Sequence, residues 1–182
     1  MGGGLETALA CHLRVASAST RIGFPEVLRG TIALSGTQRL PRLLSLEQSL
    51  DLIVSGRTAT VIEFAGTPLF DRVVEEDTNV LDAALTLARE CVASGVLPVL
   101  VRKRAMTRKD AATCFADARP RVRDAAADNV APLCAVVAIE AAVICDDFEE
   151  GLAQARGIYE TLMRSESVTR LRDRFFAERN SD

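Results

Sequence analysis

The sequence predicts an α/β fold whose second half is largely helical, and three observations predict it. Residues 1–75 are dense in glycine and hold short apolar runs between turn signals, whereas residues 78–180 carry one glycine-poor helical pattern after another. Apolar residues make up 48% of the 182 residues but aromatic residues only 4%, so Ala, Leu and Val must build the core, which suits closely packed helices. At this length one core can bury enough surface without disulfide or metal staples.

The first part, residues 1–75, mixes short helices and strands. The apolar spacing of LETALACH predicts a helix, LRVAS and RIGF predict short strands, and GTQRLPRLL and LEQSLDLIVSG predict two further helices. Strands and helices that alternate in this way are typical of α/β proteins.

The second part, residues 76–182, is predicted to be a helical extension. Leu81, Ala84, Leu85 and Ala88 form one stripe, and TRKDAATCFADARPRVRDAA predicts a polar helix interrupted by Pro120. VAPLCAVVAIEAAVI is apolar nearly all round, which indicates a core helix, and the two segments after it are amphipathic. No apolar run reaches the roughly 18 residues of a membrane span, so no span is predicted.

Charge and cysteine content exclude several classes of partner. A net charge of −3 gives no general attraction to nucleic acid, and the basic run VRKRAMTRK, which lacks interleaved aromatic residues, is interpreted as a solvated helix end. The cysteines are odd in number and lack CxxC spacing, which favours buried free thiols in a reducing compartment. With one histidine in the chain, no metal site can be assembled, and no Ser/His/Asp set of a hydrolase is present.

The opening MGGGLETALACH predicts a site for an oxyanion. Glycines at a helix start leave backbone N–H groups free and let a ligand approach the backbone closely. Glu6 stands in the first turn, and Glu26 follows twenty residues later in the turn GFPE, where the returning chain can bring the two carboxylates together. When two carboxylates face each other, their pKa values move apart, so that one can hold a proton while the other accepts one. The addition of water to a double bond requires such a pair.

These motifs, GGGLETALACHLRVAS, RIGFPEVLRGTI, GTQRLPRL and DLIVSGR, together resemble the enoyl-CoA hydratase/isomerase (crotonase) superfamily. The helical remainder, ending in FFAER, is similar to the segment that follows the hydratase domain in multifunctional fatty-acid oxidation enzymes. The resemblance implies a partial crotonase-like fold in which residues 1–75 are the C-terminal part of the hydratase core. Residues 76–182 would lead toward a 3-hydroxyacyl-CoA dehydrogenase domain that this chain does not contain.

The resemblance also implies roles for particular residues. Gly3 would donate its N–H to a thioester oxyanion, Gly2 and Gly4 would shape the turn, and Glu6 and Glu26 would be the acid/base pair. The substrate would be an acyl-CoA thioester and no cofactor would be needed, NAD serving only the absent dehydrogenase domain. The implied locations are cytoplasmic, peroxisomal or glycosomal.

Two departures from the family pattern accompany the resemblance. The family builds much of its sheet and a second oxyanion donor upstream of the glycine-led helix, so the chain is expected to be N-terminally truncated, poorly active and prone to self-association through exposed strand edges. The loop TIALSGTQR is one residue shorter than the family's. The alternative hypothesis is a non-catalytic remnant or helical interaction module of the same family.

Overall fold

The computed structural model describes residues 1–106, 108–125 and 129–179. Short elements of both kinds fill the first part: α1 (Gly3–Ala10), β1 (Val15–Ser17), β2 (Arg21–Gly23), the 3₁₀-helix η1 (Pro25–Arg29), α2 (Gly36–Arg39), η2 (Leu40–Arg42), α3 (Leu46–Ser55), β3 (Thr58–Thr60), η3 (Val61–Phe64) and β4 (Arg72–Val74). The rest is helical: α4 (Val80–Ser94), η4 (Val101–Lys103), α5 (Ala111–Ala125), α6 (Ala131–Ile144), α7 (Phe148–Met163) and α8 (Glu166–Arg179). The predicted α/β fold with a helical second half is confirmed.

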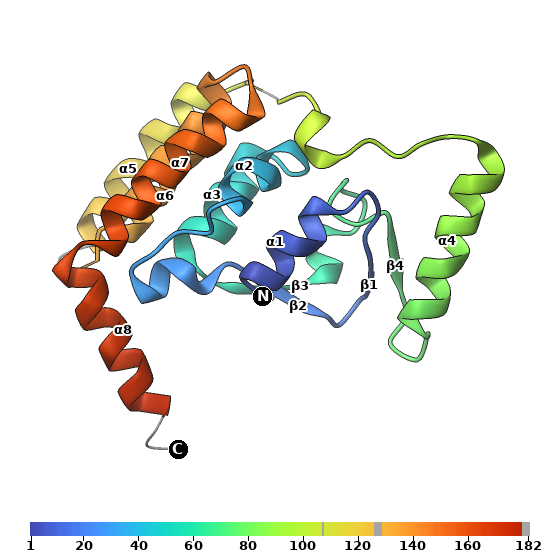
Figure 1. The fold of residues 1–182 in the computed structure, drawn as a ribbon, viewed down its shortest axis with the longest axis horizontal. Coiled ribbons are helices and arrows are strands. Elements are labelled where there is room, and N and C mark those ends of the chain that lie inside the picture. The colour runs from blue at the N-terminus through green and yellow to red at the C-terminus, as the bar shows by residue number, and fades with distance from the viewer. Residues whose placement is uncertain (107, 126–128, 180–182) are drawn as a thin grey trace.

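The strands form two small sheets. β1 pairs in parallel with β4, with Val15 opposite Arg72, and β2 pairs antiparallel with β3, with Ile22 opposite Ala59. In Figure 1, β1 and β4 lie between α1 and α4. The short return from β1 to β2 carries the chain from the end of α1 back to its beginning, which brings η1 close to the start of α1.

The core is centred on α6, which is apolar nearly all round as the sequence predicts, with Glu140 as its one charged residue. Its buried residues include Ala135, Val136 and Ile139, and the same apolar cluster contains Leu5 and Phe24 of the first part. Figure 1 shows α5, α6 and α7 side by side, with α2 and α3 beneath them and α1 in the middle of the molecule. Small side chains on α6 allow this close packing of helices.

Two predicted elements need correction. The helix α5 runs through Pro120 without a break, because the residues around it are held against α6, where Phe115 and Val122 are buried. Residues 107 and 126 of the predicted segment lie outside the described residues. The helix predicted over GTQRLPRLL is divided into α2 and the 3₁₀ turn η2, since Pro41 has no N–H to continue an α-helix.

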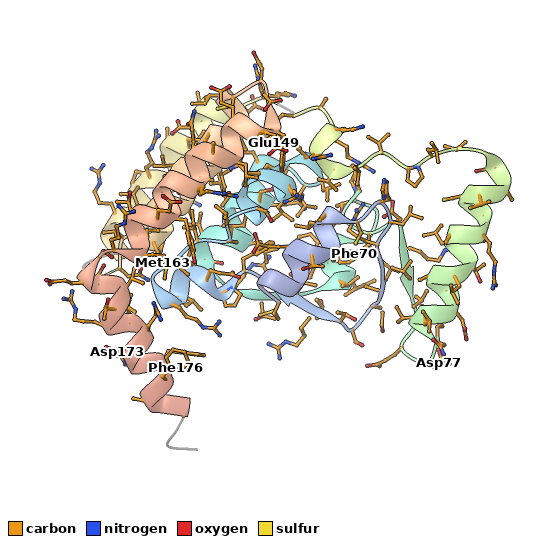
Figure 2. The ribbon with its side chains drawn as sticks, in the orientation of Figure 1. Phe70, Asp77, Glu149, Met163, Asp173 and Phe176 are labelled. Atoms are coloured by element: carbon orange, nitrogen blue, oxygen red, sulfur yellow. The ribbon has the colours of Figure 1, made fainter. Side chains whose placement is uncertain are left out.

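The helix α4 stands apart from the helical bundle and packs on β1 and β4 (Figure 1). Its outer face is apolar and exposed, with 66% of Leu81, 44% of Leu85 and 82% of Val92 accessible to solvent. Asp77, labelled in Figure 2, marks the turn that leads into this helix. The predicted apolar stripe of α4 is therefore packed against the strands along one edge and exposed to solvent along the other.

The thiols and the basic run differ partly from expectation. All five cysteines are free, but only Cys145 is buried and Cys11 is exposed, because Cys11 ends α1 at the surface. In the basic run, Arg102 and Arg108 pair with acids of the α6–α7 region, Glu149 at 3.5 Å and Asp146 at 2.6 Å. Among the described residues, no helix is long and apolar enough to cross a membrane.

Candidate active site

Gly2 turns the chain into α1, and its conformation requires glycine. Its φ of 53° is in the left-handed region, and its N–H donates to the carbonyl of Gly23 over 2.8 Å. The carbonyl of Gly2 accepts from the N–H groups of Leu5 and Glu6, at 2.8 and 3.1 Å, and so begins the helix. The hydrogen bond to Gly23 joins this helix start to the end of β2.

Gly3 and Gly4 face open space at the same helix start. A Cβ on either residue would meet nothing within 4 Å. The N–H of Gly4 donates to the carbonyl of Met1 over 3.2 Å, whereas within the described residues the N–H of Gly3 has no acceptor. The exposed N–H of Gly3 is therefore available to a ligand oxygen.

Glu26 lies directly beside Gly2. Pro25 starts the 3₁₀ turn η1, and the next residue, Glu26, extends so close to the backbone of Gly2 that a Cβ there would lie 2.5 Å from Glu26 Oε1. Glu26 Oε2 is buried and, within the described residues, has no hydrogen-bond partner. Burial raises the pKa of the Glu26 carboxyl, and the charge of Glu6 raises that pKa further.

Glu6 is held quite differently from Glu26. Its Oε1 accepts three hydrogen bonds, from the Ser35 N–H at 2.6 Å, the Ser35 hydroxyl at 2.9 Å and the Gly36 N–H at 2.8 Å. All three donors lie at the N-terminus of α2, of which Ser35 is the N-cap and Gly36 the first residue. Glu6 is thus held in place as a hydrogen-bond acceptor, whereas the carboxyl of Glu26 is desolvated.

The turn that carries Glu26 is held from behind by the second part of the chain. Asn129 donates to the carbonyl of Val27 over 2.7 Å, and Arg29 stacks on the ring of Phe175 at 4.2 Å. Gly30 lets α8 approach, since a Cβ there would lie 3.2 Å from the backbone of Val168. The helical part therefore positions η1.

Of the five predicted site residues, the structure brings Glu26 into contact with Gly2. Glu6 lies in the first turn of the helix that Gly2 begins, and its charge acts on Glu26. Gly3 and Gly4 lie at the same helix start with open space around them. The sequence reasoning missed Ser35 and Gly36. Their only signal is a serine followed by glycine at the start of a predicted helix, a position whose N–H groups lack partners within the helix.

The arrangement of the two carboxyl groups and the backbone donor fits proton transfer. Within residues 1–106, 108–125 and 129–179, no cluster of three or more His, Cys, Asp or Glu side chains could hold a metal ion. A desolvated carboxyl that can hold a proton lies beside a hydrogen-bonded carboxylate and a free backbone donor. Such a set can move protons at carbon while the backbone stabilises a developing oxyanion.

A glycine-led helix with two converging carboxylates on a mixed α/β scaffold defines the crotonase class of proteins. Carnitinyl-CoA dehydratase from Mycobacterium avium 104 has this fold, with a TM-score of 0.62, 28% identity and coverage of 98% of this chain and 57% of that one. Carnitinyl-CoA hydratase from Mycobacterium avium gives a TM-score of 0.60 at 25% identity, covering 98% of this chain and 56% of that one.

The chain belongs to the enoyl-CoA hydratase/isomerase family, whose sequence profile matches residues 1–159. The peroxisomal bifunctional enzymes of Danio rerio and Homo sapiens are 34% and 33% identical to it across the whole chain. The chain spans 25% of the length of each of these relatives. The predicted family resemblance is confirmed.

Proposed function

We propose that this chain carries the acid/base residues of an enoyl-CoA hydratase/isomerase of fatty-acid β-oxidation. The observation that carries the proposal is the close approach of the Glu26 carboxyl to Gly2, at the start of the helix that carries Glu6 and the unpartnered N–H of Gly3. The family supports an acyl-CoA thioester as substrate. The names of the bifunctional relatives, which are peroxisomal, support a peroxisomal location.

In hydration, water adds across the double bond of a 2-enoyl-CoA. The oxygen of water bonds to C3 while Glu6 takes one of its protons, and Glu26 in its protonated form delivers a proton to C2. Glu6 is then protonated and Glu26 is a carboxylate, and loss of a proton from Glu6 with uptake by Glu26 restores the pair. The atoms of one water are all in the product, so no oxidant, reductant or cofactor is required.

The thioester oxygen gains negative charge as the C3–O bond forms. The N–H of Gly3 would donate to that oxygen, because it is exposed and its helix start attracts negative charge. By the family resemblance, a second donor would come from a loop upstream of residue 1. By the same resemblance, NAD would serve only the dehydrogenase reaction of multifunctional relatives and not the hydration step.

The division into a hydratase-core part, residues 1–75, and a helical extension, residues 76–182, stays a prediction.

Self-association is also proposed, and the exposed apolar face of α4, with Leu85 and Val92, supports it. Light scattering on the purified chain tests it: a mass above that of one chain that returns to the monomer value in Leu85→Glu is expected. A monomer at all concentrations would contradict it.

The experiment that tests the proposed function measures hydration of crotonyl-CoA by the purified protein, alone and joined to a family upstream segment that supplies the second oxyanion donor, through loss of the enoyl absorbance. Glu26→Gln and Glu6→Gln should each lower the rate ~10²–10⁴-fold, because an amide keeps the shape of the side chain but cannot exchange the proton. Glu47→Gln, an exposed acid in the first turn of α3, is the matched control and should leave the rate unchanged. Turnover that survives in both active-site variants would contradict the assignment and favour the non-catalytic alternative.

A further inference from the structure

The turn between η1 and α2 ends in three donors that converge on one oxygen. Ser35 supplies two of them, its N–H and its hydroxyl, and Gly36 supplies the third, all to Glu6 Oε1 at 2.6–2.9 Å. Hydrogen bonds to a carboxylate are shorter and stronger than those between neutral groups. Three of them on one oxygen fix both the position and the rotation of the carboxylate group.

The donors are themselves held by the core. Gln38 is fully buried in α2, and its amide donates to the carbonyl of Ala138 in α6 over 2.8 Å. Thr37 is also buried, and its hydroxyl donates to the carbonyl of Leu34 over 2.9 Å. The turn is thus fixed relative to the helical bundle. The hydrogen bonds from Ser35 in that turn then fix the position of the Glu6 carboxylate.

The consequence for chemistry concerns the second oxygen of Glu6. All three hydrogen bonds end on Oε1, so Oε2 is the atom left to accept a proton from water. Attack on C3 needs the water oxygen within a few tenths of an ångström of its productive position, because rates fall steeply with misplacement. A carboxylate free to rotate would hold the water in several orientations.

We propose that Ser35 is a positioning residue for the hydration step, its hydroxyl and N–H holding Glu6 Oε1 so that Oε2 faces the attacking water. The inference rests on the proposed role of Glu6 in hydration. It sets hydration apart from double-bond isomerisation, which consumes no water and does not need this orientation.

The kinetic test compares Ser35→Ala with Ser49→Ala in the purified protein. Ser35→Ala removes one donor to Glu6, whereas Ser49→Ala removes a hydroxyl of α3 that donates to the carbonyl of Ser45, the N-cap of the same helix. Loss of a hydrogen bond to a charged group should lower kcat for hydration about tenfold or more, with KM for the enoyl-CoA unchanged. The isomerisation rate should be retained in Ser35→Ala, and both rates should be retained in Ser49→Ala.

A merely structural role of Ser35 predicts a different pattern. Equal losses of hydration and isomerisation in Ser35→Ala, or the same loss of hydration in Ser49→Ala, would overturn the proposal. A wild-type chain that hydrates no enoyl-CoA even when joined to a family upstream segment that supplies the second oxyanion donor would overturn the proposed function itself. A working wild type whose hydration is untouched by Ser35→Ala would overturn only the role of Ser35.

A spectroscopic test observes the contact without catalysis. In Glu6→Gln, the backbone amide protons of Ser35 and Gly36 should move upfield in the ¹H–¹⁵N spectrum, because a neutral amide oxygen is a weaker acceptor than a carboxylate. Glu47→Gln, which changes the same charge at an exposed site, should leave both resonances in place. Unmoved Ser35 and Gly36 resonances in Glu6→Gln would show that the contact is absent and would overturn the proposal.

Discussion

Gly2 and Glu26 approach so closely that a Cβ on Gly2 would lie 2.5 Å from Glu26 Oε1. No real Cβ lies this near a carboxylate oxygen, so any other residue at position 2 must move Glu26 or the helix start. The positive φ of Gly2 adds backbone strain for a residue with a side chain. Gly2 thus leaves room for the carboxylate of Glu26, which lies twenty-four positions later in the chain.

Gly2→Ala is therefore expected to lower hydration strongly, by about tenfold or more, since a displacement near 1 Å at the reacting groups costs up to ~10²-fold. The measurement is kcat/KM on crotonyl-CoA together with the urea midpoint. Gly157→Ala is the control, because a Cβ at that helical position meets nothing within 4 Å and should stabilise the protein by about 0.5–1 kcal/mol. Wild-type kcat/KM in Gly2→Ala would contradict the contact.

The desolvated carboxyl of Glu26 should make stability depend on pH. Since the pKa of Glu26 is raised in the folded protein, the folded state binds more protons than the unfolded state, and stability falls as pH rises. The window starts near the ordinary pKa of 4.5 and ends at the raised pKa. Relative to Glu26→Gln, the wild type should lose free energy of unfolding across this window.

Urea unfolding of the wild type and Glu26→Gln at a series of pH values measures this difference. Below the window both side chains are uncharged in both states, so the difference in free energy of unfolding should be constant there. It should change through the window and be constant again above it. A difference independent of pH throughout would mean that Glu26 is not desolvated.

Arg14 links the start of β1 to the start of β4 and is almost completely buried, at 3% exposure. Its guanidinium donates to the carbonyls of Leu69 at 2.7 Å and Cys11 at 3.0 Å and lies 3.0 Å from Asp71 Oδ2. Arg14→Leu should lower the free energy of unfolding by about 3 kcal/mol, because it removes the cation paired with Asp71 and the side-chain donors to both carbonyls, while only the backbone N–H of residue 14 still donates to Asp71.

The matched control for Arg14 is Arg57→Leu. Arg57 pairs with Asp51 and Glu63 at the surface, and exposed pairs contribute at most about 1 kcal/mol. Chemical unfolding of both variants gives the comparison. Equal effects of the two substitutions would show that Arg14 is not a buried link between the strands.

How much of the structure the sequence predicts depends on how far apart in the chain the interacting residues lie. Local patterns predict α1, α3 and the apolar helix α6, because periodicity and caps are properties of neighbouring residues. The capping box of Ser45 and Gln48 at α3 is an example. Glycines and acids in a recognisable order also predict the site residues Gly2 and Glu26.

Long-range contacts decide what the sequence could not predict. The donors of Ser35 reach Glu6 across 29 positions, and nothing in SGTQR itself indicates which acid they meet. Pro120 predicts a helix break by its local chemistry, yet packing of α5 against α6 keeps the helix continuous. In both cases the tertiary structure outweighs the local preference.

The unlike surroundings of the two carboxylates predict that hydration and isomerisation depend on them unequally. Isomerisation needs one group that removes a proton from one carbon and returns it to another, and Glu26, with its raised pKa and close approach to Gly2, is suited to that exchange. Hydration needs Glu6 as well, to hold the water. Glu6→Gln should therefore reduce hydration of a 2-enoyl-CoA far more than isomerisation of a 3-enoyl-CoA, while Glu26→Gln should reduce both by ~10²-fold or more. Rates of both reactions measured on the same preparations provide the test, and equal losses of both activities in Glu6→Gln would contradict this division of labour.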